Sequence, residues 1–143
     1  MRTRLLAFAS AVALVAAVVA GIAAAKGGNH LTAQLRGTNE VPAAPASNKG
    51  RVEIRLSAGK VCWDFTIAHI DGKGLAAHIH KGAPGKAGPV FIPLGTSFKR
   101  QGCVSAPKAK INAVASKPGA YYVNVHNAKH VGGAMRGQLH RDT

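Results

Sequence analysis

Two histidines are separated by a single residue in the segment His78-Ile79-His80, and a third, His126, lies much later in the chain. Alternate residues of a β-strand point to the same face, so two such imidazoles can converge on one ion. His126 ends the segment 121–126, which also alternates as a strand does. Three neutral imidazoles suit copper or zinc, and not magnesium or calcium. The spacing therefore predicts a metal site formed by His78, His80 and His126.

The histidine spacing has a second interpretation, in which the pair lies on the solvent face of an edge strand or in a hydrogen-bonded cluster. Five acidic residues are too few to supply most ligands of a hard-cation site, and no GxSxG, HExxH or phosphate-binding glycine loop occurs. We expect His30, His130 and His140 to be mostly solvated, with His130 as a minor candidate for an outer neighbour of His126. His69 is expected to be only a strand-end residue.

Two further residues share the predicted strand face of His126. Tyr122 is expected to form a hydrogen bond near the site. Asn124, two residues before His126, is expected to orient a ligand from outside the coordination sphere.

Alternation of apolar and polar residues dominates the chain after residue 30. The clearest case is residues 61–67, where Val61, Trp63 and Phe65 share one face. Short strands at this spacing predict an all-β sandwich or barrel with one short helix. The other expected strands are 31–35, 51–56, 75–80, 90–94, 121–126 and 134–140, and the helix is 107–116.

The chain has 143 residues, enough for one compact domain and too few for a large multidomain enzyme. Residues 1–25 have the pattern of a secretory signal, in which Arg2 and Arg4 precede a long apolar run that ends in alanines. The alternative is an uncleaved membrane anchor. Cleavage after about Ala25 would leave one exported domain, residues 26–143, with no membrane span in the mature chain.

The two cysteines, Cys62 and Cys103, form an even pair in a chain that we expect to be exported. Such a pair predicts a disulfide, because exported proteins fold in oxidising surroundings. The alternative is that the two thiols are metal ligands, although no CxxC or cysteine-rich cluster supports it.

The formal net charge is +14, and removal of Arg2 and Arg4 with the signal leaves +12. This excess favours binding to anionic cell-wall or other extracellular polymers. Nucleic acid is not an expected partner, because export and few exposed aromatic residues argue against it.

Several short motifs occur in order along the mature chain. They are Asn39-Glu40-Val41-Pro42, His78-Ile79-His80 followed by Gly82 and Gly88-Pro89-Val90, and Tyr122-Val123-Asn124-Val125-His126 leading to Arg136-Gly137-Gln138-Leu139. Together they resemble the CHRD domain, a module named after chordin that also occurs in bacterial exported proteins. The resemblance covers about residues 31–140 and implies an immunoglobulin-like Greek-key sandwich or barrel with limited similarity to Cu/Zn superoxide dismutase. The family has no settled biochemical function.

The similarity to the dismutase implies roles for individual residues. His78 and His80 resemble that family's HxH copper ligands, and His126 resembles its late copper ligand. Arg136 resembles the arginine that guides the anionic substrate. Val90 stands where the dismutase has the histidine that bridges copper and zinc, and the remaining zinc ligands have no evident counterpart. The similarity therefore implies copper as the cofactor, and not zinc.

Three functions follow as expectations. The first is an exported domain that binds copper through three histidines. The second is a non-catalytic module that binds anionic cell-surface polymers, and the third is copper-only redox activity of the dismutase type, with Arg136 orienting the substrate. Whether the protein is an enzyme is left open by the sequence.

Overall fold

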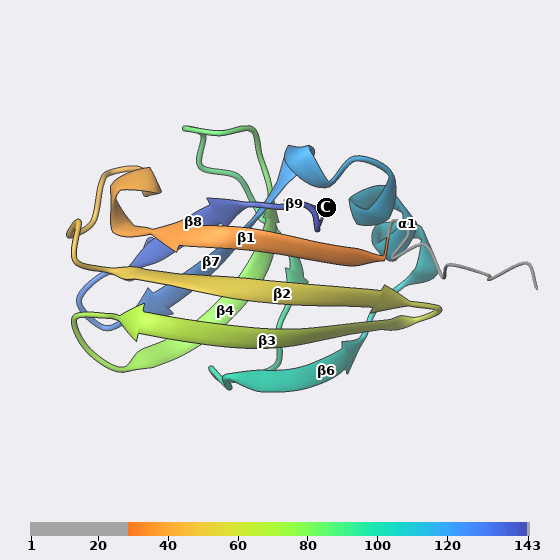
Figure 1. Ribbon diagram of the computed structural model, residues 1–143, viewed down its shortest axis with the longest axis horizontal. Helices are drawn as coiled ribbons and strands as arrows, with labels where there is room; N and C mark the ends of the chain where they lie inside the picture. Colours follow the sequence, from red (N-terminus) through yellow and green to blue (C-terminus); the bar gives the residue numbers. More distant parts are fainter. Residues whose placement is uncertain (1–28, 143) are drawn as a thin grey trace, which may run out of the picture.

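The computed structural model describes residues 29–142 as a curled antiparallel sheet of nine strands with one α-helix (Figure 1). The all-β class with one short helix is therefore confirmed, whereas the signal predicted for residues 1–25 lies outside the described residues. The strands are β1 (His30–Arg36), β2 (Lys49–Ser57), β3 (Lys60–His69), β4 (Gly74–Lys81), β5 (Val90–Pro93), β6 (Gln101–Ser105), β7 (Tyr121–Asn127), β8 (Met135–Gln138) and β9 (His140–Arg141). The helix is α1 (Lys108–Ser116), and the 3-10 turns are η1 (Gly37–Asn39) and η2 (Pro118–Ala120).

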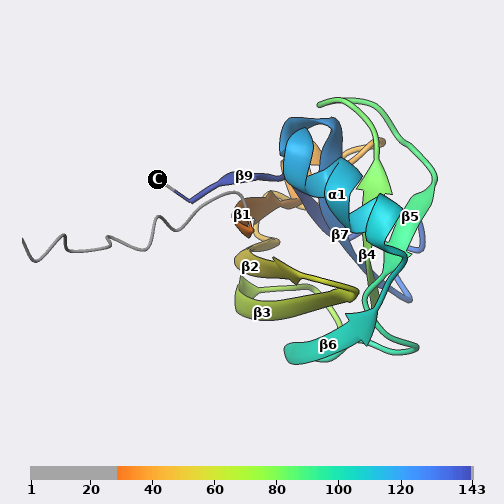
Figure 2. The ribbon, with the colours of Figure 1, turned by 90° about the vertical axis from the view of Figure 1, so that its right-hand side faces the viewer.

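Across the sheet the strands follow the order β5-β4-β7-β8-β1-β2-β3-β6, and β9 pairs with β1. The sheet curls, so that β4 and β7 lie behind β1, β2 and β3 in Figure 1. Figure 2 shows the two halves from one end, with β5 and β6 at the two ends of the strand order. Because β5 and β6 do not pair with each other, the curl is a half-barrel with an open side.

The hydrophobic core lies inside the curl and is formed by the apolar face of each strand. In β7 the side chains of Tyr121, Val123 and Val125 enter this core, and the period of two then turns the intervening residues outward. Helix α1 covers one end of the curl and buries Ile111 and Val114 (Figure 2). None of the helices in residues 29–142 has the length and apolar character needed to cross a membrane.

A disulfide joins Cys62 to Cys103 and confirms the predicted pairing. The two residues are direct register partners in β3 and β6. Strand β6 was not among the predicted strands, because Val104 is its one large apolar residue. The single strand expected at 134–140 is divided into β8, which pairs with β7 and β1, and β9, which pairs with β1.

Candidate metal centre

Strands β4 and β7 place the three predicted histidines on one face of the sheet. Their register pairs His80 with Tyr122, His78 with Asn124 and Ala76 with His126. The residues between them point into the core, so the histidine face is the outer face of this half of the sheet. The two strands therefore bring together rings that are 48 residues apart in the sequence.

The three imidazoles of His78, His80 and His126 converge on one point. Each ring offers one nitrogen atom, and these atoms all lie within 4.8 Å of one another. The closest pair is Nδ1 of His78 and Nε2 of His126, 3.1 Å apart. Ring centroids are 4.9 to 5.6 Å apart. The convergence predicted from the HxH spacing and from His126 is present in the structure.

Backbone carbonyls fix the orientation of two of the rings. Nδ1 of His80 lies 2.9 Å from the Gly88 oxygen, and Nδ1 of His126 lies 3.0 Å from the Val131 oxygen. A carbonyl oxygen only accepts hydrogen bonds, so Nδ1 is the protonated nitrogen in both rings. In the neutral ring this leaves a lone pair on Nε2, the arrangement typical of metal-binding histidines.

The Nε2 atom of His80 is buried and has no hydrogen-bond partner among the described residues. Buried polar atoms are nearly always partnered, because the loss of hydration is otherwise uncompensated. A metal ion bound by this lone pair would supply the missing partner.

The electrostatics of the site keep the rings neutral. Burial, together with the charges of His126 and His80, lowers the pKa of His78 to about 4. Burial also lowers the pKa of His80 and of His126, although the carbonyl hydrogen bonds oppose this effect. Neutral imidazole is the form that binds metals, so at neutral pH a proton does not compete for the three lone pairs.

Tyr122 packs directly against the site. Its ring stacks on His80 with centroids 5.0 Å apart and an interplanar angle of 9°. Its hydroxyl accepts a hydrogen bond of 3.0 Å from the N–H of Gly88. Gly88 is also the residue whose carbonyl orients His80. The guanidinium carbon of Arg136 lies 4.5 Å from the centroid of the same tyrosine ring. Tyr122 thus links the His80 ring to the loop after β4 and to Arg136 in β8.

Asn124 lies on the same face but does not hydrogen-bond to a ligand ring among the described residues. Its amide nitrogen lies 3.3 Å from the Gly132 oxygen and 3.5 Å from Oε2 of Glu40. Gly132 follows Val131, whose carbonyl holds His126. Asn124 therefore supports the loop that orients His126 and does not contact the imidazole itself, whereas the sequence suggested a direct hydrogen bond.

Arg136 is buried in an ion pair that was not predicted from the sequence. Its Nε donates to Oε2 of Glu40 at 2.7 Å, and its Nη1 donates to the Lys86 oxygen at 3.1 Å. Burial raises the pKa of the Glu40 carboxyl, while the hydrogen bond and charge of Arg136 act in the opposite direction. Arg136 thus stabilises the ionised form of Glu40 against the effect of burial, and this contact balances the positive charge of Arg136 within the fold.

The other histidines stay outside the cluster. Nε2 of His130 lies 2.9 Å from Oδ2 of Asp71, and hydrogen bonds from His130 and Asn48 lower the pKa of Asp71 to about 2. The exposed ones are His30, His69 and His140. Val90 is the register partner of His80 and has no atom that can bind a metal. Within residues 29–142, the three histidines are the one group of potential ligands that meets at a point.

A family model described as the CHRD domain matches residues 31–139. The match includes all the motifs from Asn39 to Leu139 and confirms the resemblance to that domain. Comparisons with curated proteins and with solved structures gave no significant match. The similarity to Cu/Zn superoxide dismutase stays a prediction.

Proposed function

This chain belongs to the CHRD domain family, and we propose that it binds one copper ion through His78, His80 and His126. Membership of that family and the disulfide agree with an extracellular module. The observation that carries the proposal is the convergence of three imidazoles around the unpartnered Nε2 of His80.

The donor set favours copper over the other common metals. Three imidazole nitrogens without a carboxylate suit copper and zinc, and Cu²⁺ binds more tightly than Zn²⁺ at a given nitrogen site. Nε2 of His126 carries a lone pair, so its 3.1 Å contact with His78 requires the proton to be on Nδ1 of His78. Binding of an ion at Nδ1 of His78 would require the other neutral tautomer of this ring, with the proton on Nε2.

Redox activity of the dismutase type is a less favoured version of this proposal. Copper supplies one-electron chemistry when bound, and Arg136 was the expected guide for an anionic substrate. The guanidinium is buried and already bonded to Glu40, which reduces the attraction that it offers to an incoming anion. We therefore propose copper binding without rapid superoxide turnover, which a superoxide-consumption assay of the copper-loaded protein tests.

Binding of anionic extracellular polymers is a second candidate function. Several lysines of the described residues are exposed, among them Lys81, Lys86, Lys108 and Lys117. With a formal net charge of +14 for the chain, they favour association with polyanions. A salt titration against an anionic polymer tests this candidate, because such binding weakens steeply as ionic strength rises.

The copper proposal is tested by titrating the purified protein with Cu(II) and following binding by calorimetry and electron paramagnetic resonance. We expect one ion per chain and a spectrum with nitrogen ligands. His78→Ala, His80→Ala and His126→Ala should each abolish stoichiometric binding. His69→Ala and His140→Ala are matched controls, because both residues are exposed and outside the cluster. Retention of the site in all three ligand variants, or equal loss in the controls, contradicts the proposal.

A further inference from the structure

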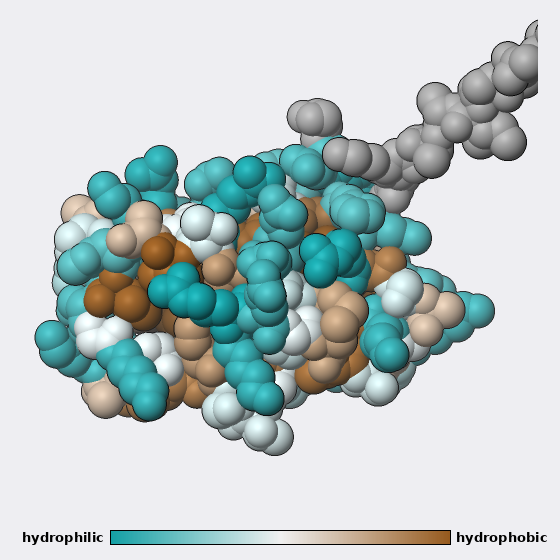
Figure 3. Space-filling model, turned by 60° about the horizontal axis from the view of Figure 1, so that its bottom comes forward, coloured by the Kyte–Doolittle hydropathy of each residue, from teal (hydrophilic) through white to brown (hydrophobic). Residues whose placement is uncertain are grey.

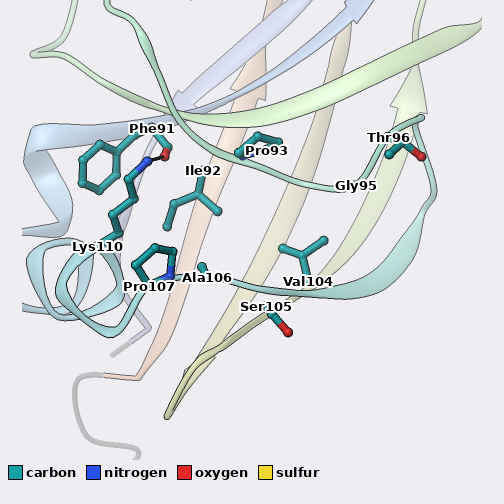
Figure 4. Close-up of a pocket in the computed structure, with 10 residues that line it drawn as sticks. All are labelled: Phe91, Ile92, Pro93, Gly95, Thr96, Val104, Ser105, Ala106, Pro107 and Lys110. Carbon is teal, nitrogen blue, oxygen red and sulfur yellow. Dashed lines mark hydrogen bonds between the residues drawn. The ribbon is translucent and has the colours of Figure 1, made fainter.

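The open side of the half-barrel contains an apolar groove of about 280 Å³. Its walls are β5 with the residues that follow it and the end of β6 with the residues that lead into α1 (Figure 4). Ile92 and Val104 point into the same hollow from these opposite walls. Figure 3, in which the lower side of Figure 1 comes forward, shows hydrophobic residues reaching the surface between hydrophilic ones.

Strand β6 pairs through one of its two edges. The Arg100 oxygen accepts from Phe65 N–H, and Ala106 N–H donates to the Gly59 oxygen, so the even-numbered residues face β3. In an antiparallel ladder the alternate residues then direct their backbone groups to the other edge. The Cα atoms of the Cys62–Cys103 pair are 4.0 Å apart, as expected for a pair without ladder bonds. The N–H and C=O groups of Cys103 therefore lie on an edge with which no described strand pairs.

The opposite wall is protected against strand addition. Pro93 in β5 has no N–H, and Nζ of Lys110 donates to the Phe91 oxygen at 2.7 Å. Proline and lysine at a sheet edge are the devices by which proteins prevent unwanted pairing. The sequence QGCVS of β6 contains neither proline nor a charged residue. An added strand would therefore pair with β6 and not with β5.

Basic residues lie at both ends of the free edge. Lys99 and Arg100 precede β6, and Lys108 follows it; all three are exposed. Lys60, the register partner of Ser105, is exposed as well. A second copy of this chain would bring like charges together, whereas a strand with acidic ends would be complementary.

We propose that the groove binds an extended peptide segment with apolar residues at alternate positions and acidic residues at its ends. The segment adds antiparallel to β6 and exchanges hydrogen bonds with the backbone of Cys103 and Ser105. Its inward side chains fill the groove beside Ile92 and Val104. This mode of recognition takes affinity from the backbone and selectivity from alternate side chains. The surface is independent of the three histidines, so its failure would leave the copper proposal unaffected.

The test uses a synthetic peptide of alternating valine and threonine with glutamates at both ends. Binding to the purified protein is followed by NMR of backbone amides and by hydrogen exchange. We expect shifts and slowed exchange at Cys103 and Ser105. A peptide with lysines at its ends should bind at least tenfold more weakly, and so should a peptide whose alternate amides on one edge are methylated.

Variants of the protein distinguish the contribution of the free β6 edge to peptide binding from that of the basic residues. Ser105→Pro removes an N–H from the free edge and should weaken binding at least tenfold, while the ladder to β3 stays intact. Val104→Lys places a charge in the groove and should have the same effect if Ser105→Pro does not fold. Lys108→Glu should weaken binding about threefold to tenfold, and Lys49→Glu, the same charge change on β2, serves as its matched control.

Three results would overturn the proposal. The first is peptide binding that shifts amides away from β6. The second is equal affinity for the glutamate-ended and lysine-ended peptides. The third is sedimentation data which show that the chain dimerises in the absence of peptide and that this dimerisation causes the NMR shifts of the β6 amides.

Discussion

Removal of the Tyr122 hydroxyl should weaken copper binding without removing any ligand. The variant Tyr122→Phe keeps the ring that stacks on His80 at 5.0 Å and that contacts Arg136. It loses the oxygen that accepts a hydrogen bond of 3.0 Å from Gly88 N–H. The Gly88 carbonyl, which holds Nδ1 of His80 at 2.9 Å, is then less firmly positioned.

The expected magnitude follows from the hydrogen bonds that are lost. The bond to Gly88 N–H is well formed, whereas the return contact from the tyrosine hydroxyl to the Gly88 oxygen is long, at 3.4 Å. One good hydrogen bond contributes about 1 kcal/mol. If all of that energy stabilises the orientation of His80 that binds copper, its loss lowers the copper affinity about fivefold. This is slightly below the range of about tenfold to hundredfold measured when a direct partner of a metal ligand is lost.

The assay is a competition titration of Cu(II) between the protein and a chelator of known affinity. Tyr121→Phe is the matched control, because it makes the same chemical change one residue away. The Tyr121 ring faces the core, with its centroid 4.9 Å from the centroid of the Phe91 ring. Its hydroxyl has no hydrogen-bond partner among the described residues. Wild-type affinity in Tyr122→Phe, or an equal loss in Tyr121→Phe, would refute the reasoning.

Three other perturbations have defined outcomes. Replacing Cys62 and Cys103 with serine should lower the free energy of unfolding by about 4 kcal/mol in urea denaturation, given their separation of 41 residues; a loss under about 1 kcal/mol would contradict the loop-entropy argument. Hydrogen bonds from His130 and Asn48 lower the pKa of the Asp71 carboxyl from 3.8 to about 2, so their stabilisation is present above pH 3.8 and lost as pH falls to about 2. The difference in unfolding free energy between wild type and Asp71→Asn should therefore shrink over this range, and a constant difference would exclude these hydrogen bonds as its cause. Gly88→Ala would collide with the backbone at the end of β4, so it should destabilise the fold by about 1 to 3 kcal/mol and weaken copper binding in calorimetry; unchanged values in both measurements would show that the loop tolerates the methyl group.

The convergence of the three histidines could be predicted because it depends in part on strand periodicity. His78 and His80 share a face wherever their segment forms a strand, and His126 lies near the end of another strand of strong alternation. The disulfide could be predicted from the even count of cysteines. The shared face of His78 and His80 needs only local pattern, whereas the meeting of these rings with His126 also depends on the pairing of β4 with β7.

The supporting contacts could not be predicted because they join distant segments. Glu40 and Arg136 are 96 residues apart, and no local pattern marks them as partners. The groups that orient the rings are backbone carbonyls of Gly88 and Val131, and a carbonyl has no signature in a sequence. Strand β6 escaped prediction because its edge position reduces the need for apolar residues, and Val104 alone was too weak a signal.

In β7 the odd-numbered residues from Tyr121 to Val125 face the core, and the even-numbered residues face outward. Val123 and Val125 pack in the core, while Tyr122 and His126 on the opposite side belong to the proposed metal centre. Substitutions on the outward side can therefore abolish or retune the centre without emptying the interior. A one-residue deletion within the strand would instead exchange the two sides and bury an imidazole among valines. We would therefore expect the outward residues of this strand to differ among related chains, whereas the length of the strand should almost never differ.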